Sequence, residues 1–351
     1  RDAGGCAPTR LLPVFTSLGV DFNVPLGWPA SLEMRVVDDC GQPFVTGFVG
    51  AAFTNGDPPI VLVPLRDGRW AATWVVRRLS NSGVTVSAIA EVPGTSLRAV
   101  VSLPGAIRGN SPTPLVIPGS VSNSATLRPG LPVAPGSLIS LFGTKLADSE
   151  KASPRSPLEL VLAGTSVAIA GRPMPLQFVA DGQVNAVVPY DVPVNTTLQL
   201  VLASGATITV PEAVVVAGAQ PGVFTKDSSG RGQGLVYLLR DGALGPLAEK
   251  GAAVRAGDAI TIVCAGLGAV SPAIEAGTTP ASGAIHSVMK PVSVTIGGVT
   301  ADVSFAGLSA LGAGLYEVRA NMPAGVEPGD LTPLVVTVDG QASPEVTIAV
   351  R

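Results

Sequence analysis

Short runs of alternating apolar and polar residues fill almost the whole chain, and they end at glycine, proline, asparagine or aspartate. Successive side chains of a strand point to opposite faces of a sheet, so these runs predict strands with one buried face. We expect strands at 31–37, 84–91, 137–142, 166–170, 198–203, 259–264, 292–296, 334–338 and 345–350. Only 157–162 suggests a helical turn. Hairpin-forming pairs such as Asp67-Gly68, Asp241-Gly242 and Asp339-Gly340 separate strands. The pattern predicts an all-β protein built of β-sandwiches.

Four blocks of sequence recur in the same order in the second and third parts of the chain. The paired blocks are 133–146 with 254–267, 166–179 with 293–306, 184–189 with 318–323, and 198–205 with 334–340. Two sheets that each bury one face need about 90–100 residues of strand and turn. The repeat therefore predicts two copies of one sandwich, of about 90 and 130 residues, which follow a first sandwich without these motifs.

Stretches rich in glycine, proline, serine and asparagine mark the boundaries, one over 109–130 and one near 219–222. We expect three tandem immunoglobulin-like β-sandwich domains. They are an N-terminal sandwich at 1–108, a linker or edge segment at 109–130, a second sandwich at 131–220, and its repeat at 221–351.

Composition excludes several classes of partner and fold. Charged residues make up 13% of the 351 residues, and hydrophobic residues make up 46%. A chain of this composition is too apolar to be disordered. The net charge of −3 argues against nucleic acid as a partner, and the apolar runs are too short for a membrane-spanning helix. The chain starts at Arg1 without a leader, so we expect a processed N-terminus or an arbitrary boundary.

The three cysteines are widely spaced. Cys6 and Cys40 lie in the same N-terminal block and are a disulfide candidate, whereas Cys264 lies in an apolar run and is expected to be a buried thiol. His286 is the single histidine and sits in a loop-like stretch, so neither a metal site nor a catalytic set is expected. Asp38, Asp39 and Asp57 offer oxygen ligands for calcium, but a turn explains the first two more simply. No cofactor is expected.

Many short motifs in 115–351 are shared with a known type of domain. They are APGSLISLFGTKLA, VNAVVP, PGVF, AGLGAVSP, VTIGGVTADVSFAGL and GLYEVRANMPAGVEPGD. This part resembles an uncharacterised C-terminal domain of acidobacterial, Solibacter-type secreted proteins, and its APGS opening is similar to immunoglobulin-like domains of the plexin and transcription-factor type. The N-terminal stretch resembles the block that often precedes that domain. The resemblance implies an exported β-sandwich array without an established activity, so no functional residues follow from it.

Two groups in the first domain are candidates for binding. Leu11, Leu12, Val14, Phe15 and Leu18 form an apolar, extended segment. It either adds to the sheet of a neighbouring copy or is the first strand of its own domain. Trp70 and Trp74 are four residues apart and share one face of a strand, where they either stack on sugar rings or fill the core.

These observations favour a non-catalytic, secreted structural protein of the cell surface or matrix. We expect it to assemble with its own copies into an extracellular filament, through strand addition and contacts between domains, because its charge-poor surface leaves sheet edges open. The alternatives are an adhesion module that binds a glycan or a surface, and an accessory region of a larger exported protein.

Overall fold

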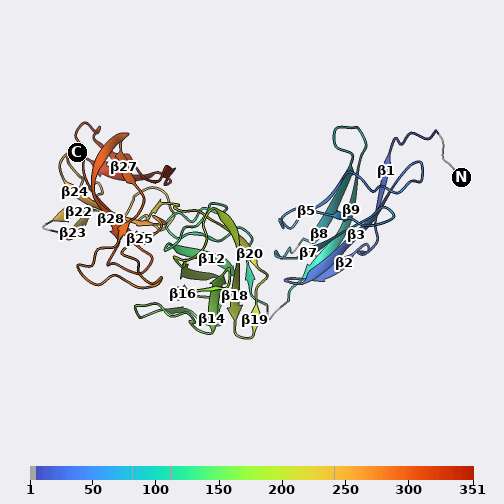
Figure 1. Ribbon diagram of the computed structural model, residues 1–351, viewed down its shortest axis with the longest axis horizontal. Coiled ribbons are helices and arrows are strands. Elements are labelled where there is room, and N and C mark those ends of the chain that lie inside the picture. Colours follow the sequence, from blue (N-terminus) through green and yellow to red (C-terminus); the bar gives the residue numbers. More distant parts are fainter. Residues whose placement is uncertain (1–4, 81, 111–112, 241) are drawn as a thin grey trace. The chain divides into compact units, whose positions relative to one another are not determined.

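The computed structural model describes residues 5–80, 82–110, 113–240 and 242–351, and every regular element in them is a β-strand. Asp241 of one expected turn lies outside these residues. The chain divides into two units, Arg1–Thr113 and Pro114–Arg351. Figure 1 shows the strands of both units and labels those for which there is room. All nine strands expected from the alternation are present, and two isolated bridges, Glu159 to Leu176 and Leu162 to Thr165, replace the expected helical turn.

The first unit is a sandwich of two sheets. One sheet has the order β1-β3-β7-β6 and the other the order β2-β9-β8-β4-β5. The strands are β1 (Leu11–Phe15), β2 (Phe22–Pro25), β3 (Pro29–Asp38), β4 (Phe48–Phe53), β5 (Ile60–Val61), β6 (Val63–Pro64), β7 (Arg69–Val75), β8 (Val84–Glu91) and β9 (Arg98–Arg108). Asp67 and Gly68 both have positive φ, 60° and 72°, in the turn between β6 and β7.

The second unit begins with another two-sheet sandwich. Its sheets have the orders β10-β12-β17-β16-β13 and β15-β14-β18-β19, with β11 on β12 and β20 on β18. The strands are β10 (Leu115–Val116), β11 (Ser122–Asn123), β12 (Leu138–Thr144), β13 (Lys151–Ala152), β14 (Thr165–Ile169), β15 (Arg172–Met174), β16 (Leu176–Val179), β17 (Gln183–Val187), β18 (Thr196–Ser204), β19 (Thr207–Ile208) and β20 (Glu212–Val216). The segment expected as a linker or edge thus supplies β10 and β11 to this sheet.

The last sandwich follows the same pairing. Its strands are β21 (Gly222–Val223), β22 (Val236–Arg240), β23 (Ala243–Leu247), β24 (Ala259–Ala265), β25 (Val270–Ser271), β26 (Ser287–Val288), β27 (Val292–Ile296), β28 (Val299–Leu308), β29 (Tyr316–Asn321), β30 (Gly329–Val338), β31 (Gln341–Ala342) and β32 (Val346–Val350). β24 pairs with β29 as β12 pairs with β17, and β27 pairs with β30 as β14 pairs with β18. The long β28 pairs with both β27 and β29, where the earlier copy uses the separate strands β15 and β16.

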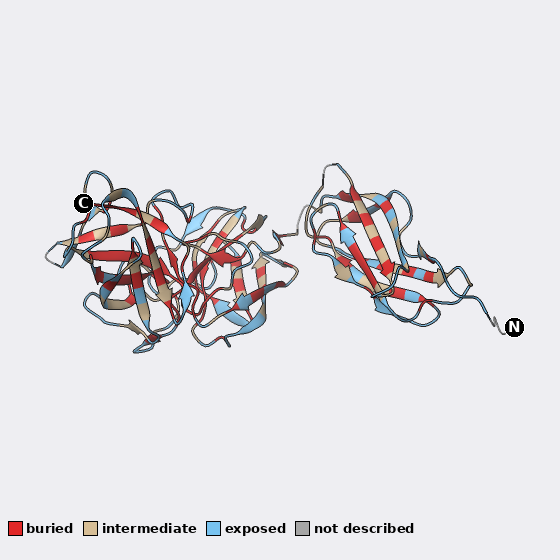
Figure 2. Cartoon of the chain, turned by 90° about the horizontal axis from the view of Figure 1, so that it is seen from above, coloured by how far each residue is buried: buried red, intermediate tan, exposed pale blue. Residues whose placement is uncertain are grey.

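Each sandwich has its own cluster of buried apolar side chains, drawn from residues 11–107, 116–216 and 219–350. β8 shows how the sequence builds them, because its residues alternate between buried and half-buried along the whole strand. Figure 2 shows such alternation of buried and more exposed residues along the strands. Alternation of this kind places one face of each sheet in a core and leaves the other face for solvent or for a neighbouring part.

Candidate functional site

The start of the first sandwich is held by a covalent and a polar link. Cys6 and Cys40 form a disulfide with their Cα atoms 5.9 Å apart. Thr9 donates two hydrogen bonds to Asp39, from its hydroxyl to Oδ2 at 2.5 Å and from its backbone N–H to Oδ1 at 2.9 Å. These bonds lower the pKa of the Asp39 carboxyl, the hydroxyl bond having the largest effect. The segment before β1 is therefore fastened to the turn after β3.

The apolar N-terminal segment is the first strand of its own sheet. β1 pairs antiparallel with β3 from Leu11 opposite Asp38 to Phe15 opposite Met34. Leu11 is buried in the core, and Phe15 and Leu18 pack against it. Only Leu12 and Val14 of the five candidate residues point outward, with 48% and 58% of their surface exposed. To add to the sheet of another copy, this strand would have to leave its own core. The structure therefore shows the segment in the second of its two expected roles, as the first strand of its own domain.

Five of the ten strands that end the described sheets contain a proline, one of them β1. Thr16 N–H donates to Glu33 O, and Asp39 N–H donates to the Arg10 carbonyl, so every second residue counted from Arg10 hydrogen-bonds to β3 through its backbone. The residues between them, Leu11, Pro13 and Phe15, direct their backbone groups to the free edge of the sheet. Proline has no N–H there to donate to an incoming strand. Other terminal strands of the described sheets carry Pro25, Pro64, Pro173 and Pro246. Proline at an edge opposes addition of another strand, so the chain protects these five strands without using charge.

Trp70 and Trp74 lie in the core of the first sandwich, where 2% and 1% of their surface is exposed. Trp70 donates from Nε1 to Phe44 O at 2.9 Å, and Trp74 donates from Nε1 to Asp57 Oδ2 at 2.9 Å. The ring of Trp74 stacks on Phe53 with centroids 4.4 Å apart. No indole face is left for a sugar, so the expectation of glycan stacking on these two residues is wrong.

Trp28 is the tryptophan that the strand pattern does not place in the core. It follows the turn after β2, and 59% of its surface is exposed. Exposed tryptophan is costly in water and is enriched at the centres of protein interfaces. Its position just before β3, outside the regular alternation, is the sequence signal that separates it from the two tryptophans of the core.

The titratable groups singled out in the sequence do not converge. Nδ1 of His286 lies 2.7 Å from the carbonyl oxygen of Pro272. Asp38 accepts hydrogen bonds from the backbone N–H groups of Cys40 and Gln42, as expected for a turn. Asp57 accepts the hydrogen bond from the indole of Trp74. Burial raises the pKa of the Cys264 thiol. The described part of the chain holds no group of three or more His, Cys, Asp or Glu side chains suited to a metal ion.

A buried tyrosine fastens the second sandwich to the third. Tyr316 of β29 is fully buried and donates its hydroxyl to Gly268 O at 2.7 Å, with Pro135 O at 3.4 Å and the Tyr190 hydroxyl at 3.5 Å. Burial raises the pKa of Tyr316 well above its ordinary value, and burial also raises that of Tyr190. Gly136, at φ 74°, leaves room for both rings, because a Cβ there would collide with them.

Further hydrogen bonds cross the same joint. Asn123 of β11 is buried and donates from Nδ2 to Gln220 O at 2.9 Å and to Ala265 O at 3.3 Å. Backbone bonds run from Leu158 N–H to Gly277 O at 2.9 Å and from Leu138 N–H to Gly314 O at 3.3 Å. Separation of the two sandwiches would leave these buried polar groups without hydrogen-bond partners. Each such group costs on the order of 1–3 kcal/mol. The joint therefore fixes one sandwich on the other.

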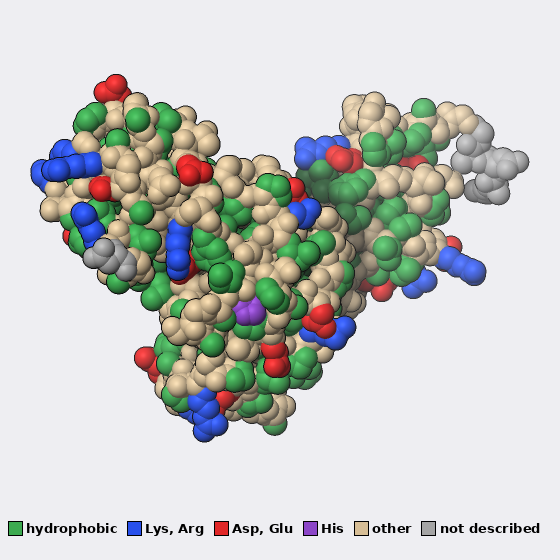
Figure 3. Space-filling model, turned by 60° about the vertical axis from the view of Figure 1, so that its left-hand side comes forward, with side chains coloured by type: hydrophobic (Ala, Val, Ile, Leu, Met, Phe, Trp, Pro, Cys, Tyr) green, Lys and Arg blue, Asp and Glu red, His purple; other side chains and the backbone are tan. Residues whose placement is uncertain are grey.

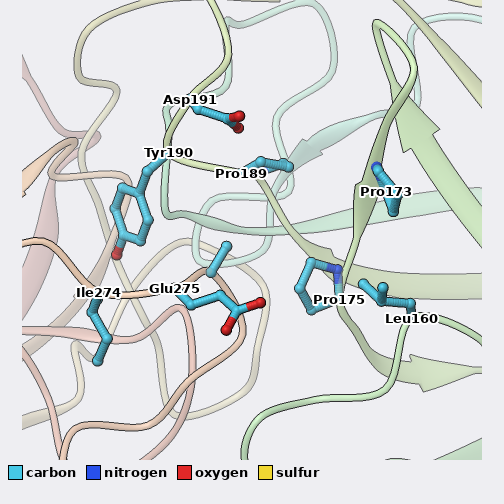
Figure 4. Close-up of a pocket in the computed structure, with 9 residues that line it drawn as sticks. Leu160, Pro173, Pro175, Pro189, Tyr190, Asp191, Ile274 and Glu275 are labelled. Carbon is cyan, nitrogen blue, oxygen red and sulfur yellow. The ribbon is translucent and has the colours of Figure 1, made fainter.

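A hollow of about 380 Å³ opens beside this joint, between the two sandwiches of the second unit. Figure 4 shows Tyr190 on one side, with Pro173, Pro175 and Leu160 on the other. The carboxylate of Asp191 lies 2.8 Å from Arg172, whereas Glu275 extends toward Pro175. The hollow is lined mostly by proline and other apolar side chains, and few of its hydrogen-bonding groups converge on one point.

A second groove, of about 350 Å³, has a different character, and we call it the amide groove. It lies where the outer face of the β12-β17-β16 sheet meets the third sandwich. The lining side chains are Ser124, Ala125, Leu127, Leu138, Ser140, Gln177, Gln183, Asn185, Phe224, Ser228, Leu235, Val263 and Leu315. All of them are uncharged. Neither sequence periodicity nor the motifs identified this groove, because its residues come from eight separate stretches between Ser124 and Leu315.

Within the described residues no helix is both long and apolar enough to cross a membrane. Charged side chains are sparse on the face shown in Figure 3, where they lie scattered among apolar and neutral ones. Surface contacts of this chain must therefore rely more on apolar and neutral polar groups than on charge.

Comparison with protein-family models finds no match, and comparison with curated proteins finds none. Among solved structures, the chain is similar to the I-band fragment I67–I69 of titin, at 11% identity over 99% of both chains with a TM-score of 0.19. It is also similar to fibronectin(III)-like modules of Clostridium thermocellum CbhA, at 12% identity over 59% of this chain and 93% of that one with a TM-score of 0.22. Dimeric latent PorU from Porphyromonas gingivalis matches at 14% identity over 95% of this chain and 32% of its own length, with a TM-score of 0.28. The assignment of tandem immunoglobulin-like sandwiches rests on the strand pairing described above.

Proposed function

We propose that this chain is a non-catalytic structural protein of the cell exterior that assembles with its own copies into a filament. The Cys6–Cys40 disulfide supports an oxidising compartment, and the resemblance of residues 115–351 to secreted acidobacterial domains supports the same location. The rigid joint between the second and third sandwiches suits a protein that transmits force or sets spacing.

The observation that carries the proposal is the apolar surface of the first sandwich. Its large exposed apolar side chains are Leu12, Val14, Val20, Trp28, Val45, Val61, Val63, Leu65, Leu79 and Val100. Single exposed apolar residues are ordinary, but this number in one small unit of a charge-poor chain favours burial against another copy. Because prolines protect the sheet edges, contact between side-chain faces is a better mode of assembly than addition of a strand.

Negative-stain electron microscopy of the purified chain tests the proposal. We expect uniform fibres from the native chain, and their loss in the double variant Leu12→Lys/Val14→Lys and in Trp28→Ser. The variant Thr197→Lys/Gln199→Lys is a matched control, because it adds the same charge at exposed positions of β18. Point variants are preferable to deletion of the first residues, since Leu11 belongs to the core. Separate monomers from the native chain at high concentration would defeat the proposal.

An adhesion module that binds a glycan is the second candidate. It no longer has Trp70 and Trp74 as a stacking platform. The observation that favours it is the uncharged amide groove.

A further inference from the structure

We propose that the amide groove binds a neutral glycan, a function independent of filament assembly. The groove has a floor of side-chain amides and hydroxyls and a wall of apolar side chains. This division matches a sugar ring, which has hydroxyl groups around its rim and C–H groups on its faces. The volume of about 350 Å³ falls within the range of ligand sites, about 300–1,000 Å³.

The floor is a hydrogen-bonded ladder across three strands. Ser140 of β12 donates to Asn185 Oδ1 at 3.0 Å, and its hydroxyl lies 2.8 Å from that of Ser124. Gln183 Nε2 donates to the same Oδ1 at 2.8 Å. Asn185 Nδ2 reaches Gln177 Oε1 only at 3.5 Å. These contacts orient the amides of β16 and β17 before any ligand arrives, which lowers the entropy that binding must overcome.

The ladder leaves two polar groups of the side chains that line the groove without a partner inside it. Among the described residues, no partner is shown for the Gln177 Nε2 group or for the Gln183 Oε1 oxygen. One is a donor and the other an acceptor. A hydroxyl group both donates and accepts, so neighbouring hydroxyls of a sugar satisfy the two together.

The wall is fixed by backbone hydrogen bonds of the third sandwich. Phe224 N–H donates to Val263 O at 3.0 Å, Leu235 N–H donates to Phe224 O at 2.7 Å, and Val263 N–H donates to Leu235 O at 3.0 Å. The half-buried ring of Phe224 is thereby held beside the floor. Aromatic and aliphatic side chains in this position contact the C–H face of a sugar ring and exclude water from the hydrogen bonds below.

The same features disfavour other ligands. No lysine, arginine, aspartate or glutamate lines the groove, so a phosphate, a nucleic acid or an acidic sugar would have no counter-charge. The floor is the outer face of paired strands rather than a free edge, so an extended peptide cannot bind there by adding to the sheet. A neutral glycan is the class that uses both the amides and the apolar wall.

Isothermal titration calorimetry of the full chain tests the proposal with four probes. They are cellohexaose, maltohexaose, an oligogalacturonate, and a neutral peptide of glycine, serine and threonine. We expect heat of binding from at least one neutral hexaose. Asn185→Ala, Gln183→Ala and Phe224→Ala should each lower its association constant about tenfold, since each removes one or two polar or ring contacts.

Gln199→Ala is the matched control, because it removes an exposed amide from β18 in the other sheet of the same sandwich. It should change the association constant less than about twofold. Thermal unfolding of each variant shows whether it is folded, and Gln183→Ala serves as the test if Asn185→Ala is unstable. Binding of neither hexaose, binding of the oligogalacturonate or the peptide alone, or equal affinity in the folded groove variants would overturn the proposal.

Discussion

The first sandwich and the two that follow it are stabilised by different side chains. All three tryptophans and the disulfide lie in Arg1–Thr113, whereas all three tyrosines lie in Pro114–Arg351, whose core is aliphatic apart from Tyr316, Cys264 and two methionines. A small single domain buries a smaller fraction of its surface than a large one does, so it gains more from large rings and a cross-link. Two sandwiches with a shared joint instead enlarge the buried surface by packing on each other. The comparison teaches that one fold reaches stability by two routes.

The distribution of aromatic residues makes the comparison measurable. Tryptophan fluorescence reports only the first unit, because Trp28, Trp70 and Trp74 all lie in it. Second-derivative absorbance separates the tyrosine bands from those of tryptophan, and its tyrosine signal reports only the second unit, through Tyr190, Tyr237 and Tyr316. Denaturation followed by both signals therefore separates the stabilities of the two units in the intact chain.

Trp74→Ala should have the largest effect. It removes a fully buried ring that stacks on Phe53, and it leaves Asp57 without the indole donor. We expect a loss of about 4 kcal/mol in the free energy of unfolding of the first unit. Urea denaturation followed by tryptophan fluorescence measures it. The tyrosine signal should not move, and Trp28→Ala should cost about 1 kcal/mol or less because that ring is exposed. Equal losses from the two substitutions would contradict the burial described here.

Removal of the disulfide should come next. Cys6→Ser with Cys40→Ser opens a loop that joins residues 34 positions apart, which should lower the stability of the first unit by about 3 kcal/mol. A reducing agent should have the same effect on the native chain, seen as a shift of the fluorescence transition to lower urea. The second unit contains only Cys264 and should not respond. A shift of the tyrosine transition on reduction would show that the two units are coupled.

Alkaline pH should weaken the second unit through its joint. The raised pKa values of Tyr316 and Tyr190 mean that the folded state holds these protons more tightly than the unfolded state does. Their contribution is fully present below the ordinary tyrosine pKa of about 10 and is lost as pH rises through the raised values. The tyrosine transition should therefore move to lower urea above about pH 10.

Tyr316→Phe sharpens this prediction. At neutral pH it should cost about 1–3 kcal/mol, since Gly268 O loses its donor inside the joint. At alkaline pH the variant should lose less stability than the native chain, because the more deeply buried phenol no longer ionises. Tyr237→Phe removes a hydroxyl away from the joint and is the control. An unchanged alkaline slope in Tyr316→Phe would assign the pH dependence to other groups.

Alternation and turn residues predicted nine of the strands, β8 and β27 among them, because burial on one face leaves a direct record in the sequence. They did not single out other long strands, such as β9 and β28. The same reasoning left Leu11–Leu18 between two roles, since an apolar strand looks alike in its own sheet and in a neighbour's. It also did not reveal the amide groove. Gln177, Gln183 and Asn185 are ordinary outward residues of strands, and they become a floor only because the third sandwich places Phe224 beside them. Contacts between separate segments depend on packing, which periodicity does not encode.

The smallest effect on stability, and a test of what protects the free edge of β1, is expected from Pro13→Thr. Threonine suits a strand and restores an N–H at the free edge of β1, so unfolding of the first unit should change by less than about 0.5 kcal/mol. The restored donor gives an incoming strand one more hydrogen bond, and sedimentation velocity should show irregular aggregates that the native chain does not form. Pro93→Thr, in the exposed turn after β8, should leave association unchanged. If Pro13→Thr behaves like Pro93→Thr, the proline is not what protects this edge, and the outward Leu12 and Val14 would have to prevent pairing by crowding the approach of a second strand.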